Sequence, residues 1–535
     1  MRSWRLRFRP LLPVLVLGVV LTAVTAGAAP FTASPPVEVS TANPFAGCPP
    51  DGSGINFPSG EVEPWIDVNP VDTDNLVAVY QQDRYSNGGA KGTVAAVTMN
   101  GGLTWTQVAV PTATRCTGGP FQRASDPWVT FGPDGTAHSM SLVTDPDLPT
   151  GGFGDNGMVY SRSTDGGLSW EDPILLVTED DPRFLHDKNS ITADPNDPDF
   201  VYAVWDRVQQ AGRAVHAPEN PIGVGFKGPI YFTRTTNGGD SWEPARKIYE
   251  TGANKQTIGN QIVVRPQGEL FDFFGDIVNR SRRRDGLGPI FVSFIVSRDR
   301  GATWTSPVRI DDQLPMSLFR ASGSTVDFEP FPCPDPAATG ACPIRGGDFI
   351  PEVAVNPANG NLYAVWMDAR FSFFQTGAFR WDSIAYSQST NGGQTWSPTI
   401  QVNRTPPGSI QNSQAFTPSV TVGDDGTVTV TYYDFRNNTA SPTTLDTTHW
   451  AVHCHPATEN CANPASWNDE TQVAPTFNIR EAPFARGYFV GDYMGLAFAP
   501  DDGDAVGPLG DAFVTAFGST LGGGPSSIFS NRLTP

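Results

Sequence analysis

Charged side chains recur at fixed places beside the short apolar runs of this sequence. Four runs end in an aspartate followed within two residues by an arginine: Asp83 and Arg84, Asp206 and Arg207, Asp368 and Arg370, Asp434 and Arg436. Other runs begin with Glu63, Asp126, Lys188, Glu352, or Asp492 and Tyr493. Arginine binds a carboxylate through two parallel hydrogen bonds, and paired carboxyl groups can act as acid and base on a glycosidic bond. These residue types could therefore bind and cleave a sugar ligand if the fold gathers them.

The repetition of the Asp–Arg pair also favours a structural interpretation. A residue that returns in every repeat usually serves the repeat itself, so we expect each pair to be a salt bridge that ties neighbouring units. The residues that do not repeat are the better functional candidates, and they are His186, Lys188, Glu352 and Tyr493.

An octapeptide of the form Ser/Thr-x-Asp/Asn-x-Gly-x-Ser/Thr-Trp occurs five times, at residues 98–105, 163–170, 235–242, 297–304 and 389–396. Its Asp or Asn can accept hydrogen bonds from backbone amides in a tight turn, and its glycine supplies positive φ. The tryptophan can bury a large apolar face beneath that turn. We therefore expect these turns to be structural staples.

Short alternating runs rich in β-branched residues surround the octapeptides, separated by Asn-Pro, Asp-Gly or Asn-Gly turns, and no stretch has helical periodicity with caps. Each unit is predicted to be a four-stranded antiparallel meander with the octapeptide in the turn between its third and fourth strands. The first strand recurs seven times, near residues 63–70, 126–131, 189–193, 261–264, 351–355, 418–422 and 492–497. The predicted fold is an all-β propeller in one domain, residues 29–535, with seven blades favoured and six as the alternative.

The last unit ends without a fourth strand. We expect Val37–Ser40 to supply it by pairing beside Ser526–Ser530. In a meander the start of the first strand and the end of the second share one rim, while the octapeptide turns lie on the opposite rim. The first of these rims is therefore the expected functional surface.

The octapeptides resemble the Asp-box, or BNR repeat, of sialidases and related propellers, and the likeness covers nearly the whole mature chain. The resemblance implies a Tyr nucleophile paired with Glu, here Tyr493 and Glu352, and an Asp acid/base, here Asp83 or Asp126. It also implies arginines that hold the sugar carboxylate, for which Arg84, Arg207, Arg370 and Arg436 are the candidates. Two positions depart from the family: Glu63 stands where the first arginine is expected, and Ser86–Gly89 where the acid/base Asp should follow.

Three functions are compatible with these residues. The first is a sialidase-like glycoside hydrolase acting on extracellular glycans, and the others are a non-catalytic glycan- or protein-binding propeller and a structural extracellular module. Arginines focused on one pocket would favour the first, whereas rim pairs that satisfy one another would favour the last. The expected partner is a glycan or glycoconjugate, the expected state is a monomer, and no cofactor or metal is predicted.

The N-terminus is typical of a cleaved export signal that ends at residue 28, with a retained signal anchor or tether as the alternative. Arg2, Arg5, Arg7 and Arg9 precede the apolar run from Leu11 to Val24, and Ala26–Ala28 supplies small residues for cleavage. The formal charge is −20 for the full chain. So acidic a protein is not expected to bind nucleic acid, nor a membrane after cleavage. We predict a secreted protein.

Six cysteines fit an oxidising compartment, although six allow fifteen pairings. Short spacing favours Cys333–Cys342 and Cys454–Cys461 as local disulfides, which leaves Cys48 with Cys116. His453 and His455 flank Cys454 and suggest a metal site as an alternative, but no second ligand cluster accompanies them.

Overall fold

The computed structural model describes residues 29–535 except 150, 211–224, 280–286, 316–343, 377–380, 409, 440, 442–443, 502 and 504–509. Nearly all of its regular structure is antiparallel β-sheet. The described helices are short: α1 (Arg370–Thr376), α2 (Ile410–Ser413) and 3-10 turns at Arg115–Thr117, Pro464–Ser466 and Ile479–Glu481. Within this part of the chain no helix is long and apolar enough to cross a membrane.

Antiparallel four-strand meanders follow one another along the described chain. The first three are β3 (Val62–Val68), β4 (Asn75–Arg84), β5 (Ala90–Met99), β6 (Thr106–Ala109); β7 (Arg123–Phe131), β8 (Ala137–Thr144), β9 (Asn156–Ser163), β10 (Ile174–Glu179); and β11 (Phe184–Ala193), β12 (Phe200–Gln210), β14 (Ile230–Thr236), β15 (Arg246–Tyr249). The next two are β16 (Lys255–Val264), β17 (Leu270–Asn279), β18 (Leu287–Ser297), β19 (Val308–Gln313); and β21 (Glu352–Val355), β22 (Leu362–Asp368), β23 (Ser383–Ser389), β24 (Ile400–Gln401).

The C-terminal part continues the same pattern with β25 (Ala415–Val422), β26 (Val428–Asp434), β27 (Asp446–Cys454), β28 (Glu470–Gln472), and then β31 (Gly495–Ala499), β32 (Ala512–Ser519), β33 (Ser527–Thr534). Four further short strands complete the connections: β13 (Gly225–Gly228), β20 (Ile344–Arg345), β29 (Phe477–Asn478) and β30 (Tyr488–Phe489). β20 and β30 pair in parallel, which brings Arg345 beside Phe489.

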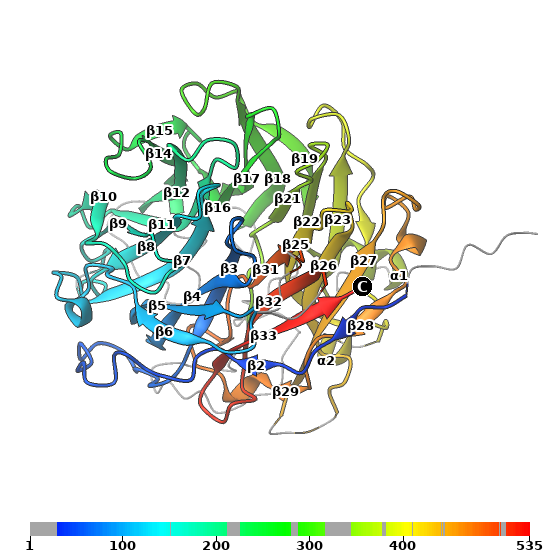
Figure 1. The fold of residues 1–535 in the computed structure, drawn as a ribbon, viewed down its shortest axis with the longest axis horizontal. Helices are drawn as coiled ribbons and strands as arrows, with labels where there is room; N and C mark the ends of the chain where they lie inside the picture. The colour runs from blue at the N-terminus through cyan, green and yellow to red at the C-terminus, as the bar shows by residue number, and fades with distance from the viewer. Residues whose placement is uncertain are drawn as a thin grey trace, which may run out of the picture.

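The meanders are arranged around a common centre (Figure 1). The first strand of each contacts the first strand of the next, from β3 through β7, β11, β16, β21 and β25 to β31, and β31 contacts β3 again. This closed radial arrangement is that of a β-propeller.

The ring is closed by the N-terminal segment, as predicted. β2 (Val37–Glu38) pairs antiparallel with β33, with Val37 opposite Ser530 and Glu38 opposite Phe529. β1 (Thr32–Ala33) extends the pairing along the same strand, opposite Leu533 and Thr534. The last meander therefore takes its fourth strand from the start of the described chain.

The octapeptides form the predicted turns between third and fourth strands, with one shared network of hydrogen bonds. In the second copy, Gly167 N donates to Ser163 Oγ (2.9 Å) and Ser169 N donates to Asp165 Oδ1 (2.8 Å). The other four copies repeat both bonds. Each turn also contacts the preceding meander. For example, Arg162 on β9 of the second meander donates to the carbonyl of Gly238 in the octapeptide turn of the third meander, at 2.8 Å. The turns thus hold neighbouring meanders together.

Apolar side chains fill the space between adjacent sheets. Because each sheet packs against two neighbours, β4 and β22 are buried along their whole length and not on alternate residues. One cluster packs Trp128 and Met140 of the second meander against Ile191 and Trp205 of the third. This packing between sheets fixes the positions of the strand ends that carry the rim residues.

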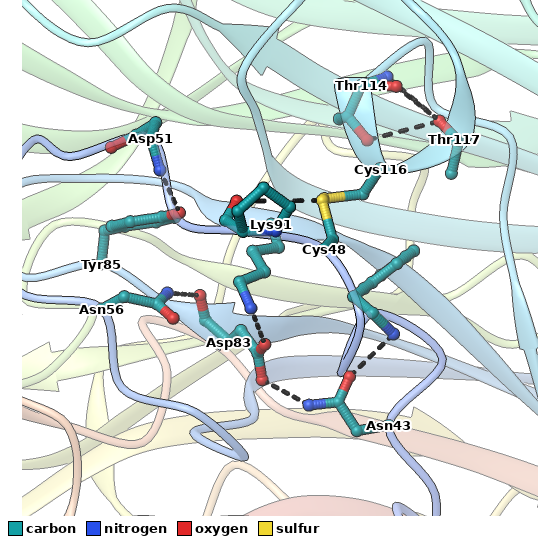
Figure 2. The surroundings of a disulfide bond; sticks show 12 residues. Asn43, Cys48, Asp51, Asn56, Asp83, Tyr85, Lys91, Thr114, Cys116 and Thr117 are labelled. Carbon is teal, nitrogen blue, oxygen red and sulfur yellow. Dashed lines mark hydrogen bonds and ion pairs between the residues drawn. A yellow bond between two sulfur atoms is a disulfide. The ribbon is translucent and has the colours of Figure 1, made fainter.

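Two of the predicted disulfides lie in the described chain, Cys48–Cys116 and Cys454–Cys461. Figure 2 shows the first of them near Asp83 and Lys91, where it ties the N-terminal segment to the first meander and the loop that follows it. Cys454 is therefore engaged in a disulfide and not in a metal site. The predicted Cys333–Cys342 pair lies outside the described residues, as does the predicted signal segment.

Candidate functional site

A β-bulge recurs near the start of the first strands and turns side chains toward the centre. In the first three meanders the bulge contains a non-glycine residue with positive φ: Glu63 (55°), Asp126 (48°) and Lys188 (47°). A left-handed backbone at such residues costs about 1–3 kcal/mol and persists only where the surroundings impose it. Three adjacent strands thus direct a glutamate, an aspartate and a lysine to one place.

These bulges line a cavity of about 240 Å³, here called the rim cavity. It lies where first strands start and second strands end, on the rim expected from the sequence. Its charged lining consists of the carboxyl groups of Glu63, Asp126, Asp145, Asp147, Asp187, Asp206, Asp348 and Asp492 and the cations of Arg84, Arg123, Lys188, Arg345 and Arg486. A cavity with several converging charges is suited to a polar ligand.

The ammonium group of Lys188 joins three carboxylates from different strands and loops. Lys188 Nζ lies 3.2 Å from Glu63 Oε1, 3.1 Å from Asp126 Oδ1 and 2.8 Å from Asp492 Oδ2. We call these four residues the Lys188 cluster. Each is at most 9% exposed, so the ion pairs are weakly screened by solvent.

Arg345 adds a second cation to the cluster. Its Nε donates to Asp492 Oδ1 at 3.0 Å, while Lys188 contacts the other oxygen of the same carboxylate. These two cations hold the pKa of Asp492 well below its usual range. Asp492 is therefore ionised at any physiological pH.

Glu63 and Asp126 differ from Asp492 in their protonation. Burial raises the pKa of Glu63 to about 7, with Lys188 opposing the shift and the neighbouring carboxylates adding to it. Burial also raises the pKa of Asp126, again against the effect of Lys188. Two carboxyl groups that share one cation cannot both ionise freely, so the pair retains a proton near neutral pH.

Four arginines line the rim cavity, and none forms the repeated pair expected from the sequence: Arg84, Arg345, Arg486 and Arg123, the last of which binds Asp51. Arg84 donates to Gln81 Oε1 (2.6 Å), and its Nε has no hydrogen-bond partner although it is buried. Burial and the charge of Arg345 lower the pKa of Arg84 to about 10. Among the described residues Arg486 forms no ion pair, and its backbone has a φ of 63°. Arg84 and Arg345 both lie over the ring of Phe489, at 5.3 and 4.2 Å from its centroid.

Three of the four predicted sugar-binding arginines are held elsewhere, so that part of the prediction is wrong. Arg370 pairs with Asp368 and Arg436 with Asp434, each within its own meander. Arg207 binds Glu179. Only Arg84 lines the rim cavity, because the left-handed backbone of Asp83 (φ 62°) turns the two side chains apart.

Asp83 is not in the rim cavity either, which argues against its predicted acid/base role. Its carboxylate contacts Lys91 Nζ (2.9 Å) and accepts hydrogen bonds from Asn43 (2.7 Å) and the Ser59 amide (2.8 Å). Figure 2 shows these contacts with Lys91 and Asn43 beside the Cys48–Cys116 bond. Asp83 instead anchors the N-terminal segment.

Glu352 and Tyr493 lie together on a smaller cavity but form no hydrogen bond with each other, contrary to expectation. Tyr493 donates its hydroxyl to the carbonyl of Pro127 at 3.1 Å. The carboxylate of Glu352 accepts from Gln261 at 3.4 Å. Burial raises the pKa of Tyr493 well above its usual range, so its phenol is not activated as a nucleophile. His186, another candidate, accepts a hydrogen bond from Trp205 (2.7 Å), and burial lowers its pKa to about 3.

Sequence reasoning missed Arg345 and Arg486 because both lie outside the repeated units. Arg345 precedes the fifth meander and Arg486 precedes the last one. Their only sequence signal is a position just before a first strand. Within the described chain, no group of three His, Cys, Asp or Glu residues is arranged to hold a metal ion.

No protein-family model and no curated protein matches this chain. Several solved structures have a chain trace similar to that of this protein. A protein of unknown function from Dyadobacter fermentans has a TM-score of 0.46 at 13% identity, covering 94% of this chain and 99% of that one. The GH93 α-L-arabinofuranosidase of Fusarium graminearum has a TM-score of 0.42 at 12% identity, with coverage of 75% and 93%. Trypanosoma rangeli sialidase has a TM-score of 0.39 at 11% identity, with coverage of 80% and 56%. At these values the similarity assigns no activity to this chain.

Proposed function

We propose that this chain is a secreted, sialidase-like glycoside hydrolase that acts on an acidic sugar of extracellular glycans in the rim cavity, with two carboxyl groups in place of the Tyr–Glu pair. The observation that carries the proposal is the pair Glu63 and Asp126. Both carboxyl groups line the cavity, share Lys188 and have raised pKa values.

In this proposal Glu63 donates a proton to the glycosidic oxygen and Asp126 is the ionised partner. Glu63 Oε1 and Asp126 Oδ1 both contact Lys188 Nζ, at 3.2 and 3.1 Å. These two oxygens therefore lie at most about 6.3 Å apart, below the roughly 6.5 Å at which the separations of inverting pairs begin. Asp126 would then form a glycosyl ester as the leaving oxygen takes the proton of Glu63. Water would hydrolyse the ester with Glu63 as base, restoring both groups.

The acidic substrate is supported by the cations that line the same cavity. Arg486 has no ion-pair partner among the described residues, and Arg84 retains a buried donor without an acceptor. A carboxylate on the sugar would supply the missing acceptor oxygens, because guanidinium groups bind carboxylates through paired hydrogen bonds. Asp492 would remain an ionised strut that fixes Lys188 and Arg345.

We further propose that residues 29–535 form one seven-bladed propeller, each meander being a blade, exported by way of the segment 1–28. The cycle of contacts among the first strands supports this count. The two disulfides support an oxidising destination.

The test is hydrolysis of fluorogenic glycosides, with a 4-methylumbelliferyl sialoside compared with neutral hexosides and an arabinofuranoside. We expect turnover of the acidic glycoside only, falling as pH rises above about 7 because Glu63 must be protonated. E63Q and D126N should each lose turnover, whereas D83N should keep it. Turnover that survives both E63Q and D126N would overturn the proposal.

A non-catalytic glycan-binding propeller is the second candidate, favoured by the saturation of Lys188 with three carboxylates. In that case calorimetry would detect binding of a sialylated oligosaccharide with no product formed over hours. Binding should then survive E63Q and be lost in R486A.

A further inference from the structure

A second cavity lies next to the Lys188 cluster, at the centre of the ring. It has a volume of about 20 Å³ and is lined by Lys188, Asn189, Asn260, Gln261, Glu352 and Tyr493, among others. We call it the axial cavity. Such a volume accommodates one water molecule or one monatomic ion, because a cavity needs roughly 10–15 Å³ for a single occupant of that size.

The axial cavity is bounded by oxygen-bearing side chains from the first strands of three neighbouring meanders. Asn189 follows the bulge residue of β11, Asn260 follows the bulge residue of β16, and Glu352 starts β21. These three strands contact one another in sequence. The fold therefore places two amides and one carboxyl group on the lining of one cavity.

Both amide oxygens are buried without a hydrogen-bond donor. The orientation of each amide is set by its nitrogen: Asn189 Nδ2 donates to the carbonyl of Asp126 (2.9 Å), and Asn260 Nδ2 donates to Asp206 Oδ1 (2.6 Å). Asn189 and Asn260 are 3% and 2% exposed. A buried oxygen without a partner is costly, by about 1–3 kcal/mol, unless something occupies the cavity and binds it.

Glu352 is a buried carboxyl group with no ion-pair partner among the described residues. Its hydrogen bond from Gln261 is long, at 3.4 Å, and the side chain is 3% exposed. Burial raises its pKa to about 8. Lys188 borders the same cavity, but its ammonium group already contacts three carboxylates.

We propose that the axial cavity binds one hard metal cation of the size of Ca²⁺ through Asn189 Oδ1, Asn260 Oδ1 and the carboxylate of Glu352. Carboxylate and amide oxygens are among the ligands that Ca²⁺ takes in proteins. The cation satisfies both orphaned oxygens and neutralises Glu352. It joins three blades at the ring centre and so has a structural role that does not depend on the proposed hydrolase activity.

Cation binding must displace the proton of Glu352, which gives the proposal a signature of its own. Below about pH 8 one proton leaves for each Ca²⁺ bound, so the apparent affinity rises about tenfold per pH unit and levels off above that pH. Binding of water displaces no proton.

The experiment is calorimetric titration of the EDTA-dialysed protein with CaCl₂ at pH 6.5, 7.5 and 8.5, in two buffers of different ionisation enthalpy. We expect one site per chain, close to one proton released at pH 6.5, and a Ca²⁺-dependent rise in Tm. E352Q should lose all three effects. Without Ca²⁺ at pH 6.5 it should keep the wild-type Tm, because both side chains are then neutral.

E61Q is the matched control. Glu61 is equally buried and its pKa is also raised to about 8, but it accepts hydrogen bonds from Gln82 and Ser40 and lies outside the axial cavity. E61Q should bind Ca²⁺ like the wild type. No heat or Tm change in the wild-type protein, as expected if the cavity holds only water, would overturn the proposal. Unchanged Ca²⁺ binding in E352Q would overturn it as well. If E352Q fails to fold, the number of protons that the wild-type protein releases on binding Ca²⁺ decides the test.

Discussion

Replacing Glu63 by glutamine should stabilise the fold increasingly as the pH rises while it abolishes hydrolysis. Burial raises the pKa of Glu63 from 4.5 to about 7. Because each pKa unit corresponds to about 1.4 kcal/mol, ionising this carboxyl group costs the folded state about 3 kcal/mol relative to the unfolded chain. Glutamine has no such cost, so E63Q removes a destabilisation that the wild-type protein retains for chemistry.

The pH window follows from the two pKa values. Below pH 4.5 Glu63 is protonated in both states, and its titration leaves the free energy of unfolding unchanged. Between 4.5 and about 7 the unfolded chain releases the proton that the folded chain keeps, so wild-type stability falls as pH rises. The free energy of unfolding of E63Q minus that of the wild type should therefore increase by about 3 kcal/mol across this window. The amide hydrogens of the glutamine side chain beside Lys188 destabilise E63Q by an amount that does not depend on pH. This amount therefore does not contribute to the increase.

The assay is urea unfolding followed by tryptophan fluorescence at half-unit steps from pH 4.5 to 8.5, with hydrolysis measured on the same samples. E63Q should lower kcat by about 10²–10⁴, the usual contribution of a general acid. E61Q is again the control, since it should show a pH-dependent gain in stability and keep full activity. A difference between E63Q and the wild type that does not change with pH would refute the reasoning.

Three further predictions concern the cavity and the frame. R486A should raise KM for an acidic glycoside about tenfold or more with little change in kcat, because a lost charge-assisted hydrogen bond costs about 1.5–3 kcal/mol; steady-state kinetics with a neutral glycoside as the comparison checks it. The double variant C48S/C116S should have a free energy of unfolding about 4 kcal/mol lower, because the disulfide joins residues 68 apart; urea unfolding of the variant beside the wild type checks it, and equal midpoints would contradict it. G239A should lower Tm by several degrees, because a Cβ there would lie 2.0 Å from Tyr160 Oη at a φ of 97°; an unchanged Tm would mean that the octapeptide turns do not brace neighbouring meanders.

The repeats made the frame predictable from the sequence. The octapeptide at 163–170 contains its own turn network, so its place between two strands follows from local chemistry alone. The pairing of Val37 with β33 followed from counting strands, because an incomplete last meander leaves one position to fill. Both inferences need only contacts that a repeat dictates.

The site was harder to predict because it depends on departures from the repeat. Asp83 and Asp206 resemble Asp368 and Asp434 in sequence, yet Asp83 pairs with Lys91 and Asp206 accepts from Thr257, both without their neighbouring arginines. Asp83 has a left-handed backbone whereas Asp206 does not, and φ cannot be read from residue type for an aspartate. Arg345 and Arg486 lie in segments between repeats, where no periodicity marks a role.

Closure by the N-terminal strand also constrains how the protein is made. The hydroxyl of Thr534 donates to the carbonyl of Thr32, 502 residues earlier in the chain. At roughly 5–20 residues per second, the start of the chain waits about 25–100 s before its partner strand emerges from the ribosome. The Cys48–Cys116 disulfide, by contrast, can form early in synthesis and keeps the waiting segment beside the first blade. The disulfide therefore holds the N-terminal segment in place until β33 is available to pair with it.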